Sequence, residues 1–334
     1  MSVSVPDTAS KPHKGFRLDL KTAGPLLALI LLIILGYSLN PLFLGEGNVT
    51  NLLTRSAFIG IIAVGATFVI TAGGIDLSVG SMAAFIAGMM IIIMNAAVDS
   101  MGASIWTVLL GIGCSLILGI GAGFINGFLT TKGKIEAFIV TLGTQGVFYG
   151  FALVLTDKVG IPVSNEAFIF LGSLVNRTIP MAFICCLIIY IFAIFIQDRT
   201  RLGRYLFAIG GNMEGARLSG INTRFWRWLV YAFAGFLTGL AAVVLVARLE
   251  VADPVVGVKW EFEAIAATIL GGTSMNIGKG DVKGTIVGVA LLTVIRSGLN
   301  VVRIPSLWQP AIIGAVIILA IVFQVSVTAK EMKK

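Results

Sequence analysis

The sequence predicts an all-α, polytopic membrane protein with about ten transmembrane helices and both termini in the cytoplasm. Of its 334 residues, 57% are hydrophobic and 12% are charged, about half the charged share of a typical soluble domain. Mean hydropathy is +1.00. Long apolar runs recur along the chain with short polar loops between them. These observations exclude a sizeable soluble domain.

The apolar runs are assigned one by one, because a helix needs about 20 residues to cross the hydrocarbon core of a bilayer. A polar cytoplasmic tail, 1–24, precedes a first run that is longer than the apolar part of a usual signal peptide and has no clear cleavage site after it. A transmembrane domain, 25–329, then leads to a cytoplasmic C-terminal tail, 330–334. The predicted spans are Pro25–Leu44, Ser56–Ala72, Leu77–Val98, Ile105–Thr130, Glu136–Thr156, Ile179–Gln197, Phe225–Ala247, Phe262–Met275, Gly284–Val302 and Ser306–Ala329.

Two of these spans, Ser56–Ala72 and Phe262–Met275, are short for a crossing, and each contains or precedes a Gly-Gly pair. The span Ile105–Thr130 instead carries a small residue at every fourth position. Those residues are Gly111, Ser115, Gly119, Gly123 and Gly127. Such a stripe lets a neighbouring helix backbone approach closely, so we expect tight packing there, or a helix that slides against its neighbours.

The positive charges predict the orientation. With ten spans and a cytoplasmic N-terminus, 17 of the 24 Lys and Arg residues lie inside the cell, six lie outside and Arg296 lies within a span. An excess of cationic residues on the cytoplasmic side is what the positive-inside rule describes. The net charge of +8 is therefore explained by topology, and no nucleic-acid partner is expected.

The polar loop 198–224 contains a predicted short helix. Asn212 is a favoured N-cap residue, Glu214 lies in the first turn, where the helix dipole favours negative charge, and Gly220 suits the C′ position. A helix of about two turns is too short to be stable alone, so it needs a partner surface. The alternative is an ordinary loop with a chance helical turn.

Polar side chains within the apolar runs are candidates for a translocation path. Asp76, in the stretch GGIDLSVGS, either caps the next helix, which is the favoured interpretation, or lines the path. Its glycines permit broken backbone, which membranes tolerate only where it is buried or faces water. The other candidates are Asn126, Thr141, Thr144, Gln145, Arg296 and Asn300. Each of these could equally form hydrogen bonds between helices.

Catalytic and ligand-binding motifs are absent from the sequence. The stretch Gly272–Lys279 is one residue too long for a P-loop, and Gly280 follows where Ser or Thr is required. The single histidine, His13, lies in the N-terminal tail, and Cys114, Cys185 and Cys186 lie in apolar runs. We therefore expect no enzyme activity, no metal and no cofactor.

Several stretches resemble a known family. The pattern Glu214-Gly215-Ala216-x-x-x-Gly220 resembles the E-A-A-x-x-x-G loop of ABC-importer permeases, with Gly215 in place of the first Ala. SAFIGIIAVGATFVITAGGIDLSVGS, KIEAFIVTLGT, TRLGRYLFAIGGNMEGARLSGIN and FEAIAATILGGTSMNIGKG are similar to the ribose/galactoside/xylose-type sugar permeases of bacterial ABC importers. They are spread over most of the chain.

The resemblance implies a permease subunit in the cell (inner or plasma) membrane, surrounded by lipid, that works as a dimer with a second copy or a paralogue. It implies a tandem-domain ATPase that contacts the coupling loop with Asn212, Glu214, Gly215, Ala216 and Gly220. It also implies an extracytoplasmic binding protein that delivers a pentose, a hexose or a related monosaccharide. Two rival hypotheses remain: an ion-coupled secondary sugar transporter, which would need several intramembrane acids, and a membrane scaffold or channel.

Overall fold

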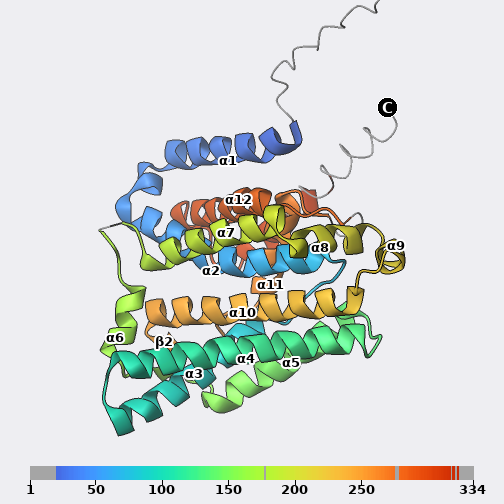
Figure 1. Cartoon of the computed structure of the whole chain (residues 1–334). Coiled ribbons are helices and arrows are strands. Elements are labelled where there is room, and N and C mark those ends of the chain that lie inside the picture. Colours follow the sequence, from blue (N-terminus) through green and yellow to red (C-terminus); the bar gives the residue numbers. More distant parts are fainter. Residues whose placement is uncertain (1–19, 177, 275–277, 317, 320–321, 323–334) are drawn as a thin grey trace, which may run out of the picture.

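The protein, described here by a computed structural model, is a bundle of long helices lying side by side (Figure 1). The structure describes residues 20–176, 178–274, 278–316, 318–319 and 322. Its elements are α1 (Leu20–Leu39), η1 (Pro41–Leu44), α2 (Glu46–Thr71), α3 (Val79–Met101), α4 (Ile105–Thr131), α5 (Ala137–Leu155), β1 (Ile161–Pro162), α6 (Glu166–Ile169), η2 (Phe170–Gly172), α7 (Met181–Arg199), α8 (Arg201–Gly211), α9 (Met213–Leu218), α10 (Thr223–Leu249), β2 (Val251–Ala252), α11 (Trp260–Leu270) and α12 (Val282–Val301).

Seven of the described helices are long and apolar enough to cross a membrane. They are α2, α3, α4, α5, α7, α10 and α12. The only sheet among the described residues is the antiparallel pair β1–β2, so the prediction of an all-α polytopic membrane protein is confirmed. The count of ten spans and the cytoplasmic termini stay predictions. The C-terminal tail, most of the N-terminal tail and part of the last predicted span lie outside the described residues, although 309–316 is helical.

The prediction that the second span, Ser56–Ala72, is too short to cross a membrane is wrong. Helix α2 has 26 residues and begins at Glu46, ten residues before the predicted start. The prediction followed the apolar run alone, whereas the polar first half of α2 is helical because its side chains find partners. Thr50 donates to the backbone carbonyl of Thr178, and Arg55 forms an ion pair with Glu263 of α11.

The other short span is confirmed, since α11 has 11 residues. Helix α3 begins at Val79, two residues after the predicted start, so Ser78 and not Asp76 occupies its N-cap position. The sequence reasoning also missed α8, which continues from α7 into the polar loop and leads to α9.

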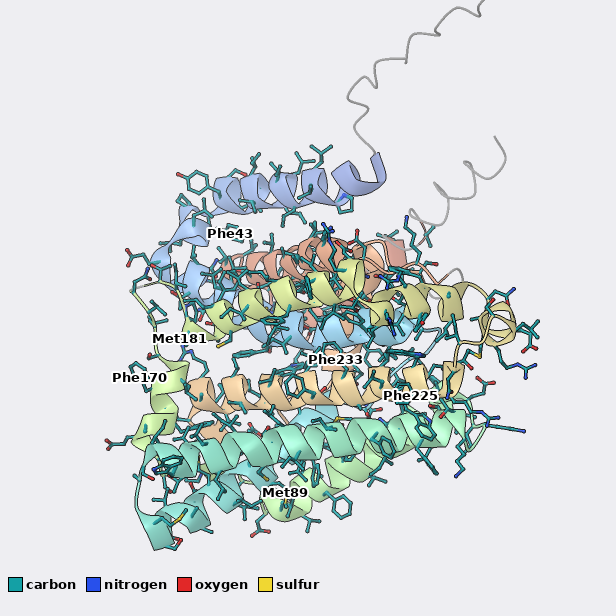
Figure 2. The ribbon with its side chains drawn as sticks, in the orientation of Figure 1. Phe43, Met89, Phe170, Met181, Phe225 and Phe233 are labelled. Atoms are coloured by element: carbon teal, nitrogen blue, oxygen red, sulfur yellow. The ribbon has the colours of Figure 1, made fainter. Side chains whose placement is uncertain are left out.

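Helices α2 and α10 form the centre of the bundle. From Ala57 to Thr71 every residue of α2 is buried, as expected for a helix that is apolar all round. Phe68 of α2 packs edge-to-face on Phe233 of α10, with ring centroids 5.3 Å apart. Figure 2 labels Phe233 on α10. On its other side α10 packs extensively against α4 (Figure 1).

The small residues of α4 lie in that contact. A Cβ at Gly119 would lie 2.3 Å from the carbonyl oxygen of Gly235, and a Cβ at Gly123 would lie 2.1 Å from that of Tyr231. Ser115 donates a hydrogen bond of 2.9 Å to the carbonyl of Gly239. The stripe is thus a close backbone-to-backbone packing surface, which is the first of the two expected roles.

Candidate functional site

Two irregular segments, 72–78 before α3 and 253–259 before α11, come together inside the bundle through the first turn of α3, which contacts the second segment. At their contact, a Cβ on Gly80 would lie 2.1 Å from the carbonyl oxygen of Gly257 and 2.6 Å from Oε2 of Glu261. Each segment leads into the first turn of a helix. The contact therefore joins two interrupted helical regions in the interior, an arrangement that membrane proteins tolerate only where it is buried or beside water.

A chain of hydrogen bonds joins the first segment to α4. Oδ1 of Asp76 accepts from the backbone N–H of Ser78 at 2.9 Å and from its hydroxyl at 2.7 Å. The Ser78 hydroxyl in turn accepts from Nδ2 of Asn126 at 2.8 Å. All three residues are buried. Asp76 thereby fixes the entrance to α3 without being its N-cap residue.

The helix that follows the second segment, α11, is joined to α5 in a similar way. Nε2 of Gln145 donates to Oε1 of Glu261 at 2.8 Å, and Glu261 is only 1% exposed. Gly80 lies between these two hydrogen-bonded groups, two residues after Ser78, and a Cβ on it would lie 2.6 Å from Oε2 of Glu261. We call Asp76, Ser78, Asn126, Gln145 and Glu261 the interior polar cluster.

Three acceptor atoms of the interior polar cluster have no hydrogen-bond partner among the described residues. They are Oδ2 of Asp76, Oδ1 of Asn126 and Oε2 of Glu261, all fully buried. Leaving a buried polar group unpaired costs about 1–3 kcal/mol, and more for a charged group. The cluster is therefore able to accept hydrogen bonds from hydroxyl groups or from water, or to bind a proton.

The structure brings together three of the seven residues predicted for a translocation path: Asp76, Asn126 and Gln145. Thr141 is buried but donates to the carbonyl of Ala137 in its own helix. Asn300 lies apart, at the end of α12, where its Oδ1 accepts from Gln309 at 2.8 Å. Thr144 donates to the carbonyl of Thr141 in its own helix, and Arg296 pairs with Glu263. A transport role for any of the seven stays a prediction.

Sequence reasoning missed two members of this region. Glu261 was detectable as an acid directly before the apolar run of α11. Tyr231 could not be recognised from the sequence, because a tyrosine within an apolar helix is ordinarily interpreted as a residue of the hydrophobic core. In the structure its hydroxyl donates to the carbonyl of Ile75 at 3.0 Å, which ties the first broken segment to α10.

At one end of the bundle, α9 has the predicted caps. Oδ1 of Asn212 accepts from the N–H of Gly215 at 2.8 Å, and Gly220 has a φ of +82°, which favours glycine. Ala216 is buried, whereas Met213 and Leu218 are 40% and 76% exposed. Helix α9 therefore presents apolar side chains outward that nothing in the described chain covers.

The charged residues of α9 pair with each other. Arg217 donates to Glu214 from Nε at 3.0 Å and from Nη2 at 2.5 Å. This hydrogen bond lowers the pKa of the Glu214 carboxyl. Because the pKa is lowered, the pair is present at neutral pH and is lost as the pH falls through the lowered value.

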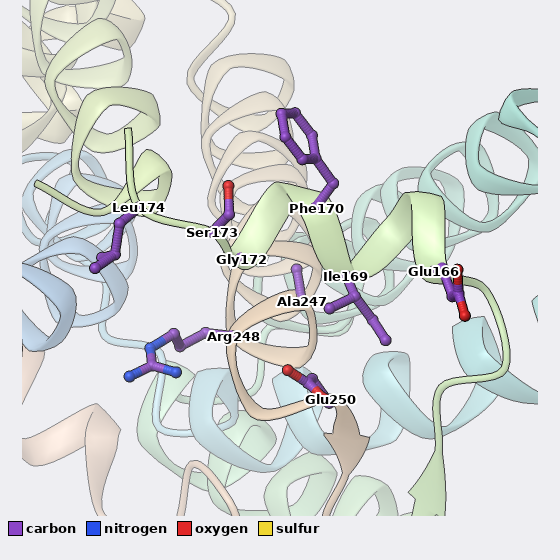
Figure 3. Close-up of a pocket in the computed structure, with 9 residues that line it drawn as sticks. All are labelled: Glu166, Ile169, Phe170, Gly172, Ser173, Leu174, Ala247, Arg248 and Glu250. Atoms are coloured by element: carbon purple, nitrogen blue, oxygen red, sulfur yellow. The ribbon is translucent and has the colours of Figure 1, made fainter. Parts of the chain in front are cut away.

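Two cavities lie at the other end of the bundle. One, of about 480 Å³, lies between α6, η2 and the end of α10, and Glu166, Arg248 and Glu250 contribute its charges (Figure 3). The other, of about 400 Å³, lies between α2, α10, α11 and α12. Its polar wall includes Arg55 and Arg296, which both pair with Glu263.

A bundle of membrane-crossing helices, interrupted in its interior at a buried polar cluster, has the architecture of a membrane transport permease. The chain belongs to the family described as the permease component of the branched-chain amino acid transport system, whose profile matches residues 48–321. It is therefore a multi-pass membrane protein of the permease type.

Individual relatives cover nearly the whole chain. The chain is 39% identical over 310 residues to the ribose import permease protein RbsC of Bacillus subtilis, with 89% of this chain and 91% of the relative covered. It is 33% identical to the D-allose transport system permease protein AlsC of Escherichia coli, with 94% and 95% covered. It is 29% identical to the fructose import permease protein FruG of Bifidobacterium longum, with 98% of each covered. No solved structure matches the chain significantly.

Proposed function

We propose that this chain is the membrane-spanning permease of an ATP-driven importer that carries a monosaccharide received from an extracytoplasmic binding protein. The names of the relatives favour a sugar, because ribose, allose and fructose permeases match 89–98% of the chain at 29–39% identity. The family description names branched-chain amino acids, so leucine is the comparison substrate in the tests below.

The observation that supports ATP coupling is the structure of α9. It is a six-residue helix capped by Asn212 and closed at Gly220, with Met213 and Leu218 exposed. Such a helix requires a partner surface, and a groove on a separate ATPase chain would supply one. The cations of the loops around α9 favour the cytoplasm for this end of the bundle, which is where ATP is.

Movement of α9 has a direct route to the interior polar cluster. Only four residues separate the end of α9 from the start of α10, and Asn222 caps α10 by accepting from the N–H of Phe225. Two turns further along α10, Tyr231 bonds to Ile75, next to Asp76. A displacement of α9 by an ATPase would therefore shift α10 and the first broken segment together, as alternating access requires.

Replacing Gly220 by proline tests this coupling. Proline fixes φ near −65° and removes the N–H, so it cannot adopt the φ of +82° and loses the bond to the carbonyl of Arg217. We expect uptake and binding-protein-stimulated ATP hydrolysis to fall at least about tenfold in proteoliposomes holding the permease, its ATPase and its binding protein, with normal membrane insertion.

The matched control is Gly102→Pro. Gly102 has a φ of +76°, has open space around it and donates to the carbonyl of Val98, but it lies in the α3–α4 connection, away from α9. We expect this variant to keep the wild-type ratio of ATP hydrolysed to sugar carried. Equal uncoupling in both variants would refute a coupling role for α9, and uptake without any ATPase would identify an ion-coupled carrier instead.

A further inference from the structure

The cavity of about 400 Å³ between α2, α10, α11 and α12 is lined by charged, polar and aromatic residues that have no role in the proposed ATP coupling. It lies at the bundle end opposite α9, where α2 begins and where α10 and α12 end. Under the proposed orientation this end faces the binding protein. The cavity is several times larger than a water molecule needs.

One side of the cavity offers hydrogen-bond donors. Nη2 of Arg55 bonds to both carboxylate oxygens of Glu263, at 3.0 and 2.7 Å, and Nη2 of Arg296 bonds to Oε1. A guanidinium has five N–H donors, and the other nitrogens of both arginines have no partner among the described residues. Glu263 thus holds two donor forks in fixed positions beside the cavity.

Another part of the cavity wall is aromatic and apolar. Trp260 stacks on Phe58 with ring centroids 6.2 Å apart and planes 5° from parallel, and both residues line the cavity. Asn51 also lines it, and its amide has no hydrogen-bond partner among the described residues. A flat apolar face, fixed donor forks and a free amide together match a ring that has C–H faces and hydroxyls around its edge.

We propose that this cavity is a sugar-binding subsite of the permease, in which Trp260, Asn51 and the Arg55–Glu263–Arg296 triad hold a monosaccharide on its way through the chain. The inference rests on the proposed function and deepens it. Trp260, which lines the cavity, is followed directly by Glu261 of the interior polar cluster, so the subsite and that cluster share the first turn of α11.

The test compares Trp260→Ala and Arg296→Lys with two matched controls near the same end of the bundle, Trp308→Ala and Arg248→Lys. Trp308 is 66% exposed and Arg248 lines the other cavity. In proteoliposomes with the ATPase and the binding protein loaded with D-ribose, we expect both subsite variants to carry at least about fivefold less ribose per ATP hydrolysed. The two controls should stay within about twofold of wild type.

Equilibrium binding of D-ribose, D-allose, D-fructose and L-leucine to the purified permease is the second arm. We expect wild type to bind at least one of the sugars, Trp260→Ala to lose that binding and Trp260→Phe to restore it. Unchanged sugar-to-ATP ratios in the subsite variants, or saturation by leucine alone, would overturn the subsite while leaving sugar import intact if wild type still carries ribose. Failure of wild type to carry or bind any of these sugars would overturn the proposed function itself.

Discussion

Replacing Gly123 by valine should destroy the packing of α4 on α10. A Cβ at this position would lie 2.1 Å from the carbonyl oxygen of Tyr231 and 3.1 Å from Cα of Ala232. These are backbone atoms of a central helix, so they cannot move aside as a flexible side chain would. Overpacking of a tight core costs about 1–3 kcal/mol, and contact with backbone places this variant at or above the upper limit.

The matched control is Gly121→Val, two residues earlier in the same helix, where a Cβ would meet no atom within 4 Å. Valine has the same intrinsic helix propensity at both positions, so the difference between the variants isolates the interhelical contact. We expect Gly123→Val to lower the apparent melting temperature in detergent by on the order of 10 °C or to prevent recovery of folded protein. Equal melting temperatures for the two variants would contradict the packing.

Features of the structure that depend on residue spacing or on local backbone chemistry could be predicted from the sequence. The spacing of the small residues in α4 marked its contact face before the partner helix was known. The caps of α9 were also readable, because Asn212 and Gly220 act through backbone chemistry within a few residues of themselves. Local signals of this kind do not depend on the rest of the fold.

The sequence could not predict which side chains pair with partners far away along the chain. The helical first half of α2 looked like a loop, because Arg55 is acceptable there only through Glu263, 208 positions later. The interior polar cluster likewise draws on four parts of the chain. Asp76, Asn126 and Gln145 were each candidates on their own, but nothing in a single sequence indicated that they meet, or that Glu261 completes the group.

The contact between the broken segments yields the second prediction, in which Gly80→Ala abolishes transport. A single methyl group at Gly80 would lie 2.1 Å from the carbonyl oxygen of Gly257 and 2.6 Å from Oε2 of Glu261. Alanine is the better helix former by about 1 kcal/mol, so α3 itself gains from the change. Any loss must therefore come from forcing the first turn of α3 and the segment 253–259 apart.

The same substitution at Gly88 supplies the control. Gly88 lies two turns further along α3, and its added Cβ would approach only the methyl group of Thr156, at 3.3 Å. We expect sugar uptake in proteoliposomes to fall at least about tenfold in Gly80→Ala and to stay within about twofold of wild type in Gly88→Ala, at similar insertion levels. The methyl group at Gly80 would press on the carbonyl of Gly257 and on Glu261 of the interior polar cluster. Unchanged uptake in Gly80→Ala would therefore mean that α3 and the segment 253–259 need not stay in contact for the substrate to pass, and the path would then have to lie elsewhere than the interior polar cluster.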